Sequence, residues 1–296
     1  MAPRALAALL AAGLLVRVAP ALADDAIPGY HVDHGTTGTV IGVGLGVGLA
    51  ASLIPIRGGA LWSSEMFGEA DDGVHGNFSR RASHLSDALV AAQLVAPVAY
   101  LMDSPIDDAV GDRLLVYGES LAVNVALLQV VKYSVQRPRP YLYNSSAAAT
   151  AYAKTATDAR LSFYSGHAAL SFGAAVTGAY LLSTRTDNHA AKNLAWGLGM
   201  MAATATANLR VRAGKHFYSD VVIGAGVGMA VGYVVPALHA EGAPYTPSAT
   251  ELELAAGGVL LGALVSQLIP LEKLQEIQIA PVPIANGLGL SFGGTL

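Results

Sequence analysis

Long apolar runs separated by short polar breaks limit the fold of this chain more than any other feature of its sequence. Each run is long enough for a helix, and several approach the roughly 20 residues that a bilayer span requires. We therefore expect an all-α fold, a compact helical bundle. The runs cover residues 36–56, 86–102, 114–131, 166–183, 193–208, 219–238 and 252–269.

The composition indicates where such a bundle would lie. Hydrophobic residues make up 53% of the chain and charged residues 13%, whereas a soluble domain carries about 25% charged residues. This depletion favours a bundle that is largely embedded in a membrane. Gln93, Glu119 and Asn124 dilute the apolar runs, so a tightly packed soluble bundle stays open as an alternative.

Cysteine content and net charge exclude other classes of protein. The chain has no cysteine, which excludes a disulfide framework and a thiolate metal site. Its formal net charge is −4, and nucleic-acid binding requires a broadly basic face. We therefore expect no nucleic-acid partner.

The N-terminus has the pattern of a secretory signal peptide. Arg4 gives a positive start, Ala5–Val16 an apolar core, and Ala21-Leu22-Ala23 a cleavage site of small residues. We expect a signal peptide at residues 1–23 and a single domain at residues 24–296. Arg17 interrupts the apolar core, so an uncleaved membrane anchor is the alternative.

Two further segments fall outside the apolar runs. Residues 57–83 contain Gly and Asp and predict a long surface loop. The tail from Ile277 alternates apolar and small residues, a pattern that favours a short strand pair.

Six of the 17 basic residues lie in two short stretches, 132–140 and 210–216. In a chain of net negative charge, this clustering indicates that an anion binds between the two stretches. Pro138 and Pro140 end the helix that carries Lys132 and force the chain to turn, which lets Arg139 fold back toward Lys132. Cations that only reach toward a membrane interface are the alternative.

The segment Ser165-Gly166-His167 precedes another apolar run. Ser is a favourable helix N-cap, and the amides of a helix N-terminus bind anions. Gly166 lets the backbone approach a phosphate closely, and His167 lies in the first helical turn. Taken alone, this segment is compatible with an ordinary capped helix.

His216 and Asp220 are four residues apart. If this stretch is helical, both lie on one face, and the carboxylate can hold the imidazole in one tautomer by a hydrogen bond. The other ring nitrogen is then available as a nucleophile.

Together these segments resemble the three motifs of the type 2 phosphatidic acid phosphatase (PAP2) and haloperoxidase superfamily, K-x6-R-P, P-S-G-H and S-R-x5-H-x3-D. The first motif matches at Lys132 and Arg139, and the third at Arg210, His216 and Asp220. The matching core spans about residues 115–235. Two positions depart from the pattern: Tyr164 stands in place of Pro, and Leu209 in place of the Ser before Arg210.

The resemblance implies a role for each matching residue. His216 would be the nucleophile that forms a phosphohistidine, Asp220 its partner, and His167 the general acid on the leaving alcohol. The phosphate would be bound by Lys132, Arg139, Ser165, Gly166 and Arg210. The family mechanism needs no metal and no cofactor, so we expect neither.

We therefore expect a metal-independent phosphatase that acts on phosphomonoesters or diphosphates, with a lipid phosphate as substrate because the body of the protein is apolar. We expect it in a bacterial cell envelope, exported and membrane-associated, with its active site facing the periplasm. The alternatives are a soluble periplasmic acid phosphatase, a vanadate-dependent haloperoxidase and a non-catalytic phosphate-binding membrane protein.

Overall fold

The computed structural model describes residues 30–62, 69–102, 108–273, 278–284 and 287–293. The expected signal peptide, residues 1–23, lies outside these ranges. In chain order the helices are α2 (His34–Ser52), α3 (Glu69–Asp72), α4 (Arg80–Leu101), α5 (Asp108–Val135), the 3-10 helix η2 (Pro140–Tyr143), α6 (Ala147–Thr155), α7 (Gly166–Ser183), α8 (His189–Arg212), α9 (Tyr218–His239), α10 (Ala249–Leu268) and the 3-10 helix η3 (Leu271–Lys273).

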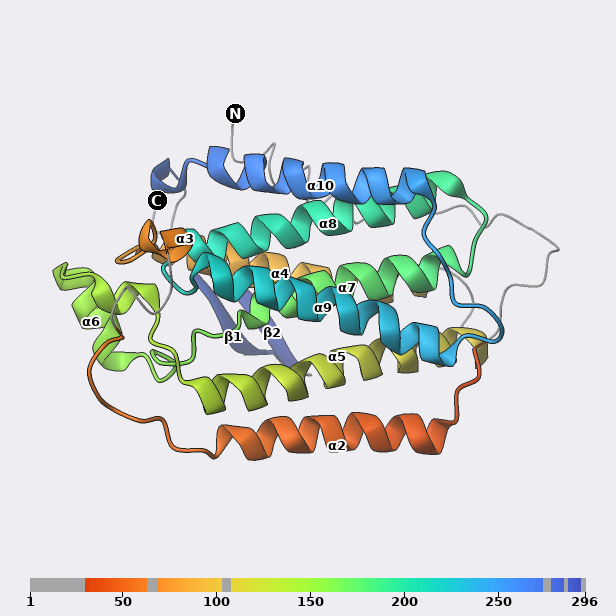
Figure 1. Cartoon of the computed structure of the whole chain (residues 1–296), viewed down its shortest axis with the longest axis horizontal. Helices are drawn as coiled ribbons and strands as arrows, with labels where there is room; N and C mark the ends of the chain where they lie inside the picture. Colours follow the sequence, from red (N-terminus) through yellow and green to blue (C-terminus); the bar gives the residue numbers. More distant parts are fainter. Residues whose placement is uncertain (1–29, 63–68, 103–107, 274–277, 285–286, 294–296) are drawn as a thin grey trace.

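Each of the seven apolar runs forms a long helix, and successive long helices run in opposite directions (Figure 1). The prediction of an all-α bundle is therefore confirmed. Beyond the helices, β1 (Gln278–Ile284) and β2 (Gly287–Gly293) pair antiparallel in the tail where a strand pair was expected. The loop predicted at residues 57–83 is shorter than expected. It contains α3, and α4 already begins at Arg80 because the Ser79 hydroxyl caps it by accepting from the Ala82 amide.

The centre of the bundle is α7, which packs against α4, α5, α8 and α9. Fifteen of its 18 residues are buried. Small residues make this possible, because they let neighbouring helices approach closely. On α9, Gly224, Gly228 and Gly232 face backbone oxygens of the segment 165–173, and a Cβ added at Gly228 would lie 2.2 Å from the carbonyl oxygen of Ala169.

The outer helices expose apolar side chains. In the described part of the chain, five segments are long and apolar enough to cross a membrane: His34–Ser52, Arg80–Leu101, Ala109–Tyr143, Tyr218–His239 and Ala249–Leu268. Leu49 on α2 is 68% exposed and Leu260 on α10 is 72% exposed. Such surfaces suit contact with lipid and support membrane association.

The alternating direction of the helices brings several of their ends together. The C-termini of α5 and α8 and the N-termini of α4, α7 and α9 lie at one end of the bundle, where α3 and α6 also lie (Figure 1). The three motifs are at these termini, so the fold places all of them at the same end.

Candidate active site

The first motif follows directly from the way α5 ends. Gln136 is in the left-handed region with φ 53°, where Gly is the usual residue. Its side chain holds this turn by donating to the carbonyl oxygen of Pro55 at 2.9 Å and accepting from the amide of Arg57 at 2.7 Å. Before the turn, Lys132 is buried and donates to the carbonyl oxygen of Leu161 at 2.7 Å.

Beyond the turn, Arg139 reaches the nucleophile predicted from the third motif. Its Nη1 donates to the carbonyl oxygen of Lys215 at 2.7 Å and lies 3.3 Å from His216 Nε2. Its Nη2 pairs with Asp158 Oδ2 at 2.8 Å. One edge of the Arg139 guanidinium therefore faces Asp158, in the loop before α7, and the other edge faces the imidazole of His216.

Arg137, two residues earlier, takes a different position. It pairs with Asp71 Oδ2 at 2.9 Å and with Asp220 Oδ1 at 2.6 Å, and its guanidinium lies 3.9 Å from the centre of the Phe217 ring. All three charged side chains are buried. The two arginines thus differ in surroundings: Arg137 is fixed between two carboxylates behind the imidazole, and Arg139 touches the imidazole itself.

The second motif caps α7. Ser165 is the N-cap, and its hydroxyl accepts from the Ala168 amide at 3.3 Å. The backbone amide of Ser165 donates to the carbonyl oxygen of Asp220 at 3.0 Å, which ties the starts of α7 and α9 together. A Cβ at Gly166 would lie 3.7 Å from Lys132 Cε, so the start of α7 and the first motif are neighbours.

His167 and Arg210 share a carboxylate from a helix that carries no motif. His167 Nε2 donates to Asp87 Oδ1 at 2.7 Å, and Arg210 Nη1 donates to the same oxygen at 2.9 Å. Arg210 also donates to the hydroxyls of Ser83 and Ser86, at 3.3 and 3.1 Å. These three partners lie on α4, so α4 orients both the predicted general acid and one predicted phosphate ligand.

His216 is oriented by a backbone carbonyl. Its Nδ1 lies 2.8 Å from the carbonyl oxygen of Ser162, and because a carbonyl oxygen only accepts, Nδ1 carries the proton. The lone pair is then on Nε2, the atom beside Arg139. The expected hydrogen bond from Asp220 is not formed, since its Oδ2 lies 3.6 Å from Nδ1.

The position of Asp220 explains this difference. The helix α9 starts at Tyr218, so His216 lies before it and the two residues do not share a helical face. Asp220 instead accepts from the Phe217 amide at 2.9 Å and from the Ser162 hydroxyl at 2.5 Å. It therefore fixes the turn that holds His216 and the serine whose carbonyl orients the imidazole.

The charges around the two histidines lower their pKa values. Burial and then the cations Arg139, Lys132 and Arg210 hold the pKa of His216 well below its usual value. Burial also lowers the pKa of His167, against the hydrogen bond to Asp87, which raises it. Both imidazoles are therefore neutral at neutral pH when no anion is bound.

The two departures from the family pattern are packed into the core. Tyr164 is 3% exposed and packs with Leu128 and Ala169, and Leu209 is fully buried beside Ala82 and Leu89. Leu209 cannot supply the hydroxyl that the family has there. The hydroxyls that Arg210 contacts come from α4 instead.

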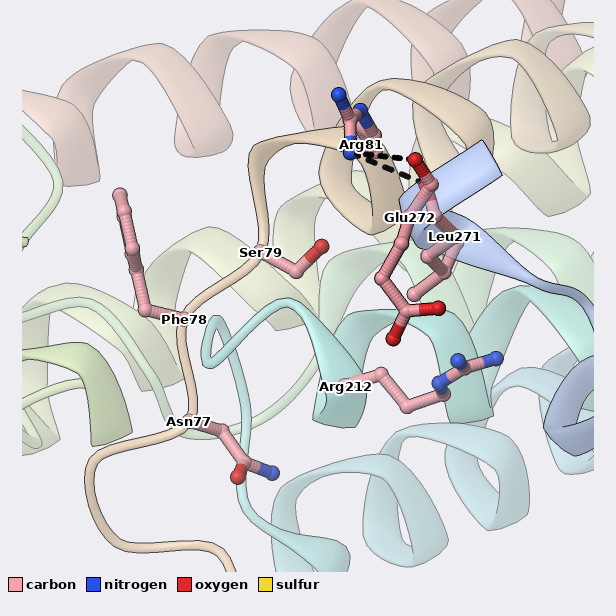
Figure 2. A pocket seen from close by; sticks show the side chains of 7 residues that line it. All are labelled: Asn77, Phe78, Ser79, Arg81, Arg212, Leu271 and Glu272. Atoms are coloured by element: carbon pink, nitrogen blue, oxygen red, sulfur yellow. Dashed lines mark hydrogen bonds between the residues drawn. The ribbon is translucent and has the colours of Figure 1, made fainter. Parts of the chain in front are cut away.

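The described residues show no group of three or more metal-binding side chains. A cavity of about 390 Å³ lies beside the C-terminal segment, and none of the predicted site residues lines it. Figure 2 shows it between Ser79, Arg212 and Glu272, with Arg81 donating to the carbonyl oxygens of Leu271 and Glu272.

Motif residues separated by up to 88 positions thus converge on one buried imidazole at the end of a helical bundle. Residues 113–242 match the model of the PAP2 superfamily. The predicted resemblance is confirmed, and the matched range agrees with the core expected at about 115–235. Searches of curated proteins and of solved structures found no match to the chain. This match to the PAP2 superfamily supports an activity of the phosphatase type.

Several residues of the candidate site were not predicted. Four of them contact a motif residue directly: Asp87, Asp158, Ser162 and Lys215. Asp71 pairs with Arg137, which in turn pairs with Asp220. Ser162 and Lys215 adjoin the motifs in sequence, so their proximity could have been anticipated. Asp71 and Asp87 lie 45 or more residues before the first motif, and only the helix packing brings them to the site.

Proposed function

We propose that this protein is a metal-independent phosphatase that hydrolyses lipid phosphates through a phosphohistidine on His216. The observation that carries the proposal is the orientation of His216. Its Nδ1 hydrogen is held by a carbonyl oxygen, and its Nε2 lone pair points to the cation-rich side, next to Arg139. A nucleophile for a phosphoryl group requires this combination.

In the first step, Nε2 of His216 attacks phosphorus and the bond from phosphorus to the leaving oxygen breaks. The negative charge that spreads over the phosphoryl oxygens is stabilised by Lys132, Arg139, Arg210 and the amides at the start of α7. Protonated His167 donates its proton to the leaving oxygen. The substrate phosphate replaces the contact that Arg139 makes with Nε2 in the free protein.

In the second step, a water molecule attacks the phosphohistidine, and His167 accepts a proton from it. The bond from phosphorus to Nε2 breaks and inorganic phosphate leaves. Asp87 supports both steps, because it holds His167 by the 2.7 Å hydrogen bond and stabilises its charged form.

A lipid substrate is favoured by the surface around the site. The helices whose ends form it include α4, α5 and α9, each long and apolar enough to cross a membrane. His167 is 27% exposed and Asp87 51%, whereas His216 is 1% exposed. The site therefore opens on the α4 side, where a head group can enter while its chains stay among apolar helices.

The test measures phosphate release by the purified chain in detergent, from phosphatidic acid, an isoprenyl diphosphate and p-nitrophenyl phosphate, each with and without chelator. We expect chelator-resistant release with the lipid substrates preferred. His216→Ala should abolish release, whereas His189→Ala, a change at an exposed histidine that begins α8 at the opposite end, should not affect it.

A base-stable phosphoryl adduct should also be trapped on the wild-type chain and be absent from His216→Ala. Release that persists in His216→Ala contradicts the phosphohistidine mechanism. Equal turnover of lipid and soluble substrates contradicts the lipid preference alone.

A further inference from the structure

We propose that Lys215, Tyr152 and Ser83 form a second anion subsite next to the catalytic phosphate site. It would bind a negatively charged group on the leaving group of the substrate, such as the inner phosphate of a diphosphate. The inference rests on the proposed function, because that function defines which side of the site holds the leaving group.

The first observation is a buried cation with no ionic partner. Lys215 is 6% exposed, and among the residues that the structure describes it forms no ion pair, in contrast to Arg137, Arg139 and Arg210. Burying a charge without an opposite charge in contact with it is costly, and Asp158 and Asp87 act on Lys215 only from beyond ion-pair distance. A ligand anion would remove this cost when it binds.

The second observation is how Lys215 is held. Its Nζ donates to the Tyr152 hydroxyl and lies 4.5 Å from the centre of the Tyr152 ring and 5.3 Å from that of Tyr141. Because the Tyr152 oxygen accepts from the ammonium group, its own hydrogen is available to a ligand. The pair can therefore offer an anion two donors side by side.

The third observation is a small cavity at this position. It has a volume of about 60 Å³ and is lined by Phe78, Ser79, Arg80, Ser83, His84, Tyr152, Ala213 and Lys215. A space of this size accommodates a few water molecules, so it suits a small polar group and not an acyl chain. Its lining adds the cation Arg80 and the hydroxyl of Ser83.

The cavity lies on the leaving-group side of the site. Ser83 is one helical turn from Asp87 on α4, and Asp87 holds His167, the proposed proton donor to the leaving oxygen. Ser83 also contacts Arg210. An anionic group attached to the leaving oxygen would therefore reach the cavity while the reacting phosphate stays at His216.

Calorimetry of the full chain in detergent tests the inference without turnover. The probes are inorganic phosphate and methylenediphosphonate, a diphosphate analogue that cannot be hydrolysed. We expect wild type to bind the diphosphonate more tightly. Lys215→Met should weaken diphosphonate binding about ten- to a hundred-fold, the value of a charge-assisted hydrogen bond, with a much smaller loss for phosphate. Lys215→Arg should restore the preference.

Lys154→Met is the matched control, because it removes an exposed lysine from α6, the helix that also carries Tyr152. It should leave both affinities as in wild type. Equal losses of both ligands in Lys215→Met, with an unchanged melting temperature, would overturn the subsite, as would a wild type without preference. A wild type that binds neither anion would instead overturn the proposed phosphate site.

Discussion

The two histidines of the site have opposite proposed roles, one as a nucleophile and the other as a proton donor. The surroundings of each histidine suit its role. His216 has to be neutral to attack, and burial among three cations lowers its pKa well below the usual value. His167 has to be protonated to donate, and its pKa is lowered less because Asp87 opposes the effect of burial.

We therefore expect kcat/KM to reach its maximum below pH 6.5 and to fall on the alkaline side as His167 loses its proton. Activity measured from pH 4 to 9 checks this, and a maximum above pH 7 would contradict it.

Asp87→Asn tests the source of the alkaline limb. Asp87 raises the pKa of His167, so its replacement by a neutral amide lowers that pKa further. The alkaline limb of kcat/KM should then move to lower pH, while the maximal rate falls because His167 is held less well. A merely structural role of Asp87 would reduce activity equally at every pH and leave the limb in place.

Arg137 and Arg139 are only two residues apart, yet we expect their replacement to have different consequences. Arg137→Ala would leave the buried carboxylates Asp71 and Asp220 without their cation, which should cost about 3–5 kcal/mol of folding free energy. Arg139 contacts His216 and pairs with Asp158, which is 41% exposed. Arg139→Ala should therefore lower activity by about a hundred-fold or more with a smaller loss of stability. Thermal melts in detergent and phosphate release, measured on both variants, separate the two effects.

At the scale of elements, the contact between α7 and α9 sets the geometry of the site, because both helices begin there. Gly228→Ala would place a Cβ 2.2 Å from the carbonyl oxygen of Ala169, so the helices have to move apart, at a cost of about 1–3 kcal/mol. Activity should fall as well, since the amide of Ser165 would shift from the carbonyl oxygen of Asp220. Gly226→Ala is the control on the same helix, because no atom lies within 4 Å of the added Cβ. Equal effects of the two substitutions on melting temperature would contradict the argument.

The elements themselves were predictable from the sequence to the extent that hydrophobic runs define helices. Seven runs became seven helices, and the alternating direction of these helices brought Lys132, His167 and His216 to one end. The ends of the helices were less predictable: α4 starts at Arg80 because Ser79 caps it, six residues before its apolar run. The role of the carbonyl of Ser162 was not predictable either, because a backbone oxygen leaves no signal in a motif. Asp71 and Asp87 approach the site only through helix packing, which no local pattern encodes.

At the scale of the whole molecule, the direction of the chain limits how the bundle can lie in a membrane. The backbone amide of His31 donates to the carbonyl oxygen of His239 at 2.9 Å, so the described chain begins at the end opposite the site. The helix α5, with 28 residues, is about 42 Å long and exceeds the bilayer core of about 30 Å. If the bundle spans a membrane, Tyr30 and the site lie on opposite faces. A cleaved signal peptide, a spanning bundle and a periplasmic site are therefore incompatible.

We expect the site to face the periplasm, which requires Tyr30 to lie on the cytoplasmic side. Residues 1–23 are then neither a cleaved signal peptide nor an anchor with Arg4 in the cytoplasm, because either would carry residue 24 into the periplasm. The absence of cysteine allows a direct test with single introduced thiols. Lys154→Cys marks the site end and Asp187→Cys the opposite end, and both positions are exposed. A membrane-impermeant maleimide added to spheroplasts should label Lys154→Cys at once and Asp187→Cys only after lysis.

The reverse pattern would place the site in the cytoplasm and agree with a cleaved signal peptide. Labelling of both before lysis would mean that the bundle lies on the membrane without spanning it, because only then are both of its ends on the same side.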